Sequence, residues 1–406
     1  QFLYFIGLIE RGSIRRMRAV LFASLLAVAF FDGLVAGASR SSGPFPPGTT
    51  ASGGVRNMAL VYLDGRSLPD AHDSTFHFDA AKFERLVGYK PAGASRAEDA
   101  LFDGTLLIGY DWVDGKRFWP GVGKPLNASD WQAISALWRT QGLEALSNAT
   151  RAVNADLNTT LPNVKLYVTI PYPDRRQQHF GDAFSTCRGG AARSLNFSVD
   201  ADRLLATQCW VAHIIHDWPT LPGVSMTGFY WFLEDMPSGD EPLVRGVADF
   251  IKAIPTHGEP SLKFTWIPYY NMAVHEAHLW RSLGFDFATI QPNVAFNDCD
   301  PATRFAEMEH LIVGTDTGVE LELPLAVRNP TFDHNATRSF DAYYEAALRY
   351  NWTGRAGGSR ARAVKTFYYG NAFVEMATSA DAALNALYVK IHDLVCDVGE
   401  SCLRFA

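Results

Sequence analysis

Residues 228–235 read GFYWFLED, a run of aromatic and apolar side chains that ends in two acids. Its composition is typical of a buried β-strand, because aromatic and β-branched residues fit the pleated surface of a sheet. Seven more runs of this kind lie before and after it in the chain, at 59–63, 105–110, 166–173, 264–270, 287–293, 319–323 and 366–370.

Segments with helical periodicity lie between these runs, at 130–156, 201–217, 243–254, 303–313, 340–350 and 380–394. Strands that alternate with helices indicate parallel βαβ units, and eight such units close a barrel. The sequence therefore predicts an α/β fold, a (β/α)8 TIM barrel. The alternative is a doubly wound open sheet, but no G-x-G-x-x-G follows the first strand and no Walker-type loop occurs.

The N-terminal region has the order of a secretory signal peptide. Met17 and Arg18 precede an apolar run at 19–31, and the small residues Ala36, Gly37 and Ala38 follow. The alternative is an uncleaved signal anchor. We expect four segments: upstream translated sequence at 1–16, a signal peptide at 17–38, a flexible Ser/Gly/Pro-rich linker at 39–54, and a single barrel domain at 55–406.

The chain also carries six N-x-S/T sequons, and their number beside a signal peptide indicates passage through a eukaryotic secretory pathway. We therefore expect a secreted or extracellular glycoprotein with no stable membrane insertion once the signal is removed. The candidate glycosylation sites are Asn127, Asn148, Asn158, Asn196, Asn335 and Asn351.

The five cysteines fit this compartment, since disulfides persist in oxidising environments. Cys396 and Cys402 lie close together and are predicted to close a small C-terminal loop. Cys187 and Cys209 are a plausible second pair, which would leave Cys299 free, although connectivity does not follow from sequence alone.

Composition excludes several function classes. The net charge of -7 and the lack of a basic run disfavour nucleic acid as a partner. His213, His216 and Asp217 have a spacing that metal ligands can use, but a solvent-facing helix end explains them as well, so we expect no metal and no cofactor. No G-x-S-x-G elbow occurs, which disfavours a lipase-type serine triad. Oligomeric state is left open.

Active sites of these barrels lie at the carboxyl ends of the strands. Here those ends are rich in aromatic, amide and acidic side chains, which suit a carbohydrate because sugar C–H faces stack on rings and sugar hydroxyls take hydrogen bonds. The candidate substrate-binding residues are Tyr110, Asp111, Tyr172, Trp231, Tyr269, Tyr270, Gln291 and Asn293.

Two glutamates on the seventh run are predicted to face the barrel interior. Strand side chains alternate between faces, so Glu320 and Glu322 point one way while their apolar neighbours face the helices. On the fourth run Glu234 shares a side with Tyr230 and Phe232. Buried carboxylates are costly unless they are paired or functional, and facing carboxylates are what glycoside hydrolysis needs. The structural alternative for Glu320 is an ion pair with an interior Arg or Lys.

Five motifs resemble domain of unknown function family 4855 (DUF4855), in that family's order over most of residues 58–370: IPYP at 170–173, GFYWFLED at 228–235, WIPYY at 266–270, QPN at 291–293 and GVELE at 318–322. The resemblance implies a glycoside hydrolase-like (β/α)8 barrel. The family's fourth-strand pattern has a second acid where this chain has Leu233, so only Glu234 carries over. Glu320 and Glu322 both match the family's seventh-strand pattern.

These observations lead to a ranked set of expectations. The first is a secreted glycoside hydrolase-like protein acting on a polysaccharide or glycan, with Glu234 as general acid/base, Glu322 as nucleophile or second base, and Glu320 in support. The alternative is a non-catalytic carbohydrate-binding barrel of the cell surface or wall. A structural or adhesive protein with a vestigial cleft is the third.

The processing of the N-terminus is directly testable. We expect the secreted protein to begin near Ser39 and to lose apparent mass on treatment with an N-glycosidase. Mass spectrometry of the secreted form checks both, and detection of residues 19–31 in it would rule out cleavage.

Overall fold

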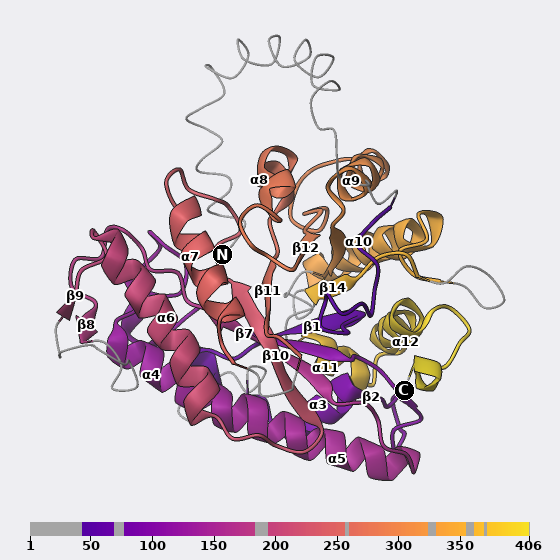
Figure 1. The fold of residues 1–406 in the computed structure, drawn as a ribbon. Coiled ribbons are helices and arrows are strands. Elements are labelled where there is room, and N and C mark those ends of the chain that lie inside the picture. Colours follow the sequence, from indigo (N-terminus) through magenta and orange to yellow (C-terminus); the bar gives the residue numbers. More distant parts are fainter. Residues whose placement is uncertain are drawn as a thin grey trace, which may run out of the picture. The chain divides into compact units, whose positions relative to one another are not determined.

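The computed structural model describes residues 43–68, 77–182, 194–255, 260–323, 330–354, 361–368 and 372–405. Eight parallel strands in the centre of this part of the chain form a closed barrel (Figure 1). In chain order the strands are β1 (Asn57–Tyr62), β4 (Gly104–Ile108), β7 (Val164–Ile170), β10 (Val224–Trp231), β11 (Lys263–Trp266), β12 (Phe287–Ile290), β13 (Gly318–Glu322) and β14 (Lys365–Tyr368). Each of the eight predicted runs contributes one strand, so the predicted TIM barrel is confirmed.

Helices surround the barrel (Figure 1). Their buried apolar residues share one hydrophobic core with those of the strands. The helices are α3 (Ala80–Val87), α4 (Ala128–Leu137), α5 (Ala145–Leu157), α6 (Asp200–Asp217), α7 (Glu241–Lys252), α8 (Tyr270–Glu276), α9 (Pro301–Thr315), α10 (Pro330–Arg349), α11 (Ala372–Thr378) and α12 (Ala382–Cys396). Three short two-stranded sheets lie outside the barrel: β2–β3 (Gly88–Tyr89 with Asp99–Ala100), β5–β6 (Lys116–Arg117 with Lys124–Pro125) and β8–β9 (Gly181–Asp182 with Ser194–Leu195).

The helix predicted at 130–156 has a wide π-helical turn at Trp138–Glu144 between α4 and α5. Gly142 lies within this turn, and a Cβ there would sit 2.5 Å from the Leu107 side chain on β4. The missing side chain therefore lets the helix approach the strand closely.

Most strands end earlier than the sequence runs suggest. Pro171, Pro268 and Pro292 follow the ends of β7, β11 and β12, and a proline has no N–H to continue a strand ladder. The fourth strand likewise ends at Trp231, three residues before Glu234. Several candidate side chains consequently lie on loops at the carboxyl ends of the strands.

Residues 43–55 pack against the amino-terminal ends of the strands. Phe45 is buried, its N–H donates to the carbonyl of Thr317, and its own carbonyl accepts from the N–H of Val364. The Tyr167 hydroxyl donates to the carbonyl of Ser52 over 3.0 Å. The expectation of a flexible linker therefore does not describe residues 43–54, which form the floor of the barrel.

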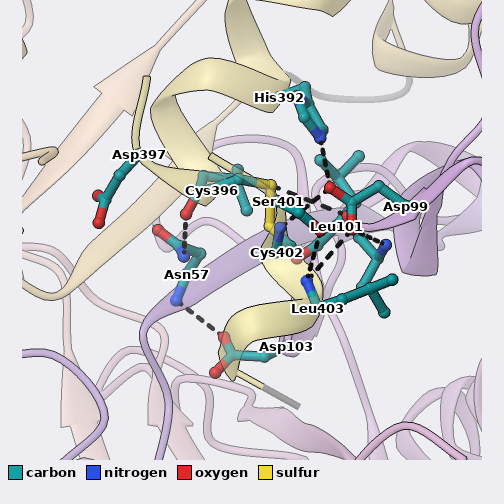
Figure 2. Close-up of a disulfide and its surroundings, with 12 residues drawn as sticks. Asn57, Asp99, Leu101, Asp103, His392, Cys396, Asp397, Ser401, Cys402 and Leu403 are labelled. Carbon is teal, nitrogen blue, oxygen red and sulfur yellow. Dashed lines mark hydrogen bonds and ion pairs between the residues drawn. A yellow bond between two sulfur atoms is a disulfide. The ribbon is translucent and has the colours of Figure 1, made fainter. Parts of the chain in front are cut away.

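A disulfide joins Cys396 at the end of α12 to Cys402, with Cα atoms 4.5 Å apart, as predicted. Figure 2 shows Asp99 beside it, whose carboxylate accepts from the His392 ring, the Ser401 hydroxyl and the Cys402 N–H. Together these contacts fix the C-terminal segment to the β2–β3 sheet.

The other cysteines agree with the sequence analysis as far as the structure describes them. Cys209 is disulfide-bonded, whereas Cys187, its predicted partner, lies outside the described residues. Cys299 is free, as expected.

Removing the C-terminal disulfide should destabilise the fold measurably. The bond spans six residues, and closing a loop of this length is worth about 2 kcal/mol in the chain-entropy account. We expect the double variant Cys396→Ser/Cys402→Ser to lose about that much free energy of unfolding in denaturant titrations. Cys299→Ser is the control and should change stability by less than about 0.5 kcal/mol. An unchanged double variant would show that the contacts of Asp99 hold the segment alone.

Candidate active site

Glu320 and Glu322 lie on β13 with their side chains almost fully buried. Burial is the largest cause that raises the pKa of Tyr230 on β10, and the charges of Glu234 and Glu320 raise it further. Burial, and then the charges of the same two carboxylates among others, also raise the pKa of Tyr62 on β1 and of Tyr368 on β14. Side chains from different sides of the barrel thus surround Glu320, which places it in the interior.

The carboxylate of Glu322 is held by three hydrogen-bond donors. The Asn293 N–H donates to Oε2 over 2.6 Å, the Asn293 side-chain amide donates to Oε1 over 3.3 Å, and the Tyr343 hydroxyl also donates to Oε2. Tyr343 comes from α10 and is itself buried. The donors fix the orientation of the carboxylate and favour its charged form.

The backbone of Asn293 makes this arrangement possible. Asn293 has a φ of 55°, in the left-handed region that asparagine tolerates better than most side chains. Its side-chain oxygen accepts from the N–H of Tyr270 over 3.1 Å, which ties the loop after β12 to the start of α8. One residue therefore supplies two donors to Glu322 and fixes the neighbouring loop.

Glu234 lies on the loop after β10 and is partly exposed. Burial of the carboxyl raises its pKa to about 7, against a hydrogen bond from the Gln291 side chain that lowers it. Burial raises the pKa of Glu322 to about 8, against the hydrogen bonds from Tyr343 and Asn293 that lower it, and the charge of Glu234 raises it further. The two carboxyls therefore share one electrostatic environment at the mouth.

Glu320 lies one pleat below Glu322 and differs from it in its contacts. Within the described part of the chain, neither carboxyl oxygen of Glu320 has a hydrogen-bond partner of ordinary geometry, and no Arg or Lys forms an ion pair with it. Burial first, and then the charges of Glu322 and Glu234, raise its pKa well above the ordinary value. Its surroundings thus favour the protonated, neutral form of Glu320, and the ion-pair alternative is wrong for these residues.

Three of the predicted substrate-binding residues lie at this cluster. Gln291 hydrogen-bonds Glu234, Asn293 bonds Glu322, and burial together with the charges of Asp235 and Glu234 raises the pKa of Tyr269. An isolated parallel β-bridge between Tyr269 and Gln291 joins the two loops that carry these residues.

Two others lie elsewhere. The Tyr270 hydroxyl donates to Glu307 over 2.6 Å and its ring lies under the guanidinium of Arg304, so this side chain packs on α9. Trp231 is fully buried against Phe264 and Tyr172. Because Tyr230 faces the interior, the next residue of the strand faces the helices, and the expectation that Trp231 contacts substrate is not supported.

Tyr110, Asp111 and Tyr172 lie beyond the ends of β4 and β7. Asp111 pairs with Arg117 over 2.9 Å, and the same guanidinium lies over the Tyr110 ring. Tyr172 borders a cleft of about 270 Å³ whose other lining residues are Arg117, Phe118, Trp119, Pro120, Gly121, Val122, Gly123, Pro125, Leu126, Asp174, Arg176 and Gln177. Aromatic faces beside paired charges make this cleft suitable for a polar, ring-shaped ligand.

A buried ion pair holds the loops that carry the site. The guanidinium of Arg203 on α6 donates to both carboxylate oxygens of Asp240, over 2.7 and 2.8 Å, and to the carbonyl of Pro173. The Tyr172 hydroxyl donates to Asp240 over 2.6 Å. The loop after β7 and the loop that carries Glu234 are therefore fixed to one another.

Sequence reasoning missed the tyrosines of the site. Tyr62 and Tyr368 end their strands, and strand parity would have placed both beside the glutamates. Tyr343 lies within a helix, and no local pattern points to its contact with Glu322.

The neutral state of Glu320 has a measurable consequence. Its folded pKa exceeds its unfolded value of 4.5, so the native state keeps a proton that the unfolded chain loses as pH rises. The free energy of unfolding therefore falls by about 1.4 kcal/mol for each pH unit above pH 4.5, until the pH reaches the folded pKa of Glu320. Glutamine cannot ionise, so we expect the stability advantage of Glu320→Gln over the wild type to grow with that slope between about pH 5 and pH 7. Urea unfolding at each pH measures this difference.

Exposed Glu98 supplies the matched control. The stability difference between Glu98→Gln and the wild type should stay flat over the same pH range. A flat difference for Glu320→Gln as well would show that Glu320 ionises in the folded protein.

Several solved barrels are similar to this chain. A mutant tryptophan synthase from M. tuberculosis, in its ligand-free form, is 12% identical, with 84% of this chain and 93% of that chain covered and a TM-score of 0.33. Endo-beta-N-acetylglucosaminidase from Cordyceps militaris is 10% identical over 84% and 91%, with a TM-score of 0.36. Clostridium thermocellum endo-1,4-beta-D-xylanase 10B is 9% identical over 89% and 69%, with a TM-score of 0.42.

No curated protein matches the chain. A family model does match, that of the domain of unknown function DUF4855, over residues 57–393. The match begins with β1 and ends within α12, so it spans the whole barrel. The chain therefore belongs to the DUF4855 family.

Proposed function

We propose that this protein is a glycoside hydrolase acting on a polysaccharide or glycan, with Glu234 as general acid/base and Glu322 as nucleophile or second base. The observation that carries the proposal is that two neighbouring carboxyls differ in their hydrogen bonds and in their exposure to solvent. Three donors hold Glu322, whereas Glu234 has one side-chain donor and is partly exposed.

The difference in hydrogen bonding bears on which of the two carboxyls carries the negative charge. Two close carboxyls in a poorly solvated site resist ionising together, so they share one negative charge near neutral pH. Burial raises the pKa of Glu322 to about 8 and that of Glu234 to about 7, so the two carboxyls hold their protons with similar strength near neutral pH. The proposal places the charge on Glu322 because three hydrogen-bond donors point at it. A protonated carboxyl with a pKa of about 7 can donate to a glycosidic oxygen and later accept a proton from water.

The positions of the two residues support the same assignment. Glu234 follows the fourth barrel strand and Glu322 ends the seventh, as the acid/base and the nucleophile do in clan A glycoside hydrolases. Neutral Glu320 adds no further negative charge beneath Glu322. Tyr269 and Gln291 would contact the sugar next to the carboxyls, and the cleft beside Tyr172 would hold a neighbouring sugar unit.

A non-catalytic carbohydrate-binding barrel is the second candidate. The cleft beside Tyr172 and Trp119 favours sugar binding whether or not a bond is cleaved. The two candidates differ in what they require of Glu234, because a binder has no need for a proton donor with a raised pKa.

We also propose that the protein is secreted and N-glycosylated. Asn148 and Asn158 are exposed, and Asn127, Asn196 and Asn351 are partly exposed, so glycans on the first two fit the folded surface directly. The side chain of Asn335 and the predicted signal peptide lie outside the described residues. Disulfide bonds at Cys209 and Cys396 fit an oxidising compartment. Within the described residues, no helix is long and apolar enough to cross a membrane.

Variants of the two glutamates test the catalytic proposal. On a panel of aryl glycosides and polysaccharides, we expect Glu234→Gln and Glu322→Gln each to lower kcat by about 10²–10⁴-fold, because each removes a group needed in proton transfer or nucleophilic attack. Sugar binding, measured by calorimetry, should survive in both.

Azide distinguishes the two roles if the enzyme retains configuration. It should rescue Glu322→Gly by forming a glycosyl azide of inverted configuration, and Glu234→Gly by forming one of retained configuration. Glu98→Gln is the control and should keep full activity. Full turnover by Glu234→Gln would end the catalytic proposal and leave the binding barrel.

A further inference from the structure

A second group of chemically active side chains lies between α4 and α6. His213, His216 and Asp217 stand out in the sequence as spaced for metal ligands, but the structure brings only His213 and Asp217 of these three into contact. His216 is exposed, whereas His213 places Nδ1 2.7 Å from Asp217 Oδ2 and Nε2 3.0 Å from Ser135 Oγ. Ser135, His213 and Asp217 thus form a continuous row, in which a hydrogen bond joins the first two and an ion-pair contact joins the last two.

Trp218 fixes the direction of these hydrogen bonds. Its indole Nε1–H, which can only donate, reaches Ser135 Oγ over 3.1 Å. The hydroxyl hydrogen of Ser135 is then free to point at Nε2 of His213. Because Asp217 can only accept as a carboxylate, Nδ1 of His213 carries the ring proton. This is the tautomer that a serine nucleophile requires, with Nε2 ready to take the hydroxyl proton.

The row opens into a cleft of about 390 Å³, lined by Gln132, Ser135, Ala136, Arg139, His213, Asp217 and Trp218. Ser135 is 2% exposed, so its hydroxyl lies at the bottom of the cleft. Gln132 and Arg139 stand three residues before and four residues after Ser135, hence on the same helix face. Both side chains line the cleft and carry N–H groups, the kind of donor that stabilises an oxyanion.

We propose that this cleft is a second, serine-based site that hydrolyses short-chain carboxylic esters such as acetyl esters. The depth of Ser135 restricts the acyl group to a small one. No nucleophile elbow is needed, since such sites are defined by geometry and not by sequence position.

The proposed reaction has two balanced steps. Ser135 Oγ attacks the ester carbonyl carbon while His213 Nε2 takes its proton; the carbon–alkoxy bond breaks, and the alkoxide leaves with that proton as the alcohol. Water then attacks the acyl-serine, gives one proton to His213, and releases the carboxylic acid as Ser135 recovers its hydrogen. Asp217 stabilises the protonated ring in both steps.

Labelling of the full-length protein tests the nucleophile directly. Diisopropyl fluorophosphate is small and forms a stable bond with activated serine hydroxyls. We expect one label per chain, located on the peptide that contains Ser135 by mass spectrometry, and loss of that label in His213→Gln. His216→Gln, the same change at an exposed position of α6, should label like the wild type. Absence of label on Ser135 in the wild type would overturn the proposal without recourse to any variant.

Turnover of p-nitrophenyl acetate gives the second readout. Ser135→Ala and Asp217→Asn should each lower the hydrolysis rate by at least about 100-fold. The exposed Ser282→Ala should leave it unchanged. Equal rates for Ser135→Ala and wild type would show that the row is only a structural link between two helices.

Discussion

The mouth of this barrel is organised by the cost of taking carboxyl groups out of water, because a buried carboxylate without partners is strongly destabilising. Three glutamates meet this constraint in three ways. Glu322 accepts three hydrogen bonds, Glu320 keeps its proton, and Glu234 retains some solvent exposure beside Gln291. The same constraint gives each carboxyl different surroundings, and differences of this kind separate acid from base in catalytic sites.

A buried ion pair also supports the loops at the mouth of the barrel. The pair of Arg203 and Asp240 joins α6 to the start of α7 and includes the carbonyl of Pro173. Breaking such a pair on one side leaves an uncompensated buried charge. The backbone of the loop that carries Glu234 is also held directly, since the Trp266 indole donates to the carbonyl of Leu233 and the N–H of Met236 donates to Glu276.

Strand parity allowed much of the site to be predicted. The alternation in GVELE placed Glu320 and Glu322 inside the barrel, and the same rule, applied to Trp231, would have placed its ring outside. Tyr343 could not be predicted, since its contact with Glu322 joins a helix to a strand without any local pattern. The Ser, Gly and Pro content of residues 39–54 suggested flexibility, yet glycines such as Gly53, at a φ of 63°, serve tight turns against the barrel floor.

That floor has a consequence for how the chain folds during synthesis. The backbone of Phe45 bonds the residue before β13 and the residue before β14, so this pair of hydrogen bonds is complete only when the chain has been made as far as the last strand. Contacts of such long sequence separation form late and slowly. Until then Phe45 lacks its second backbone anchor over Trp280 and Phe287, and aromatic surface of this kind favours aggregation while a chain is incomplete.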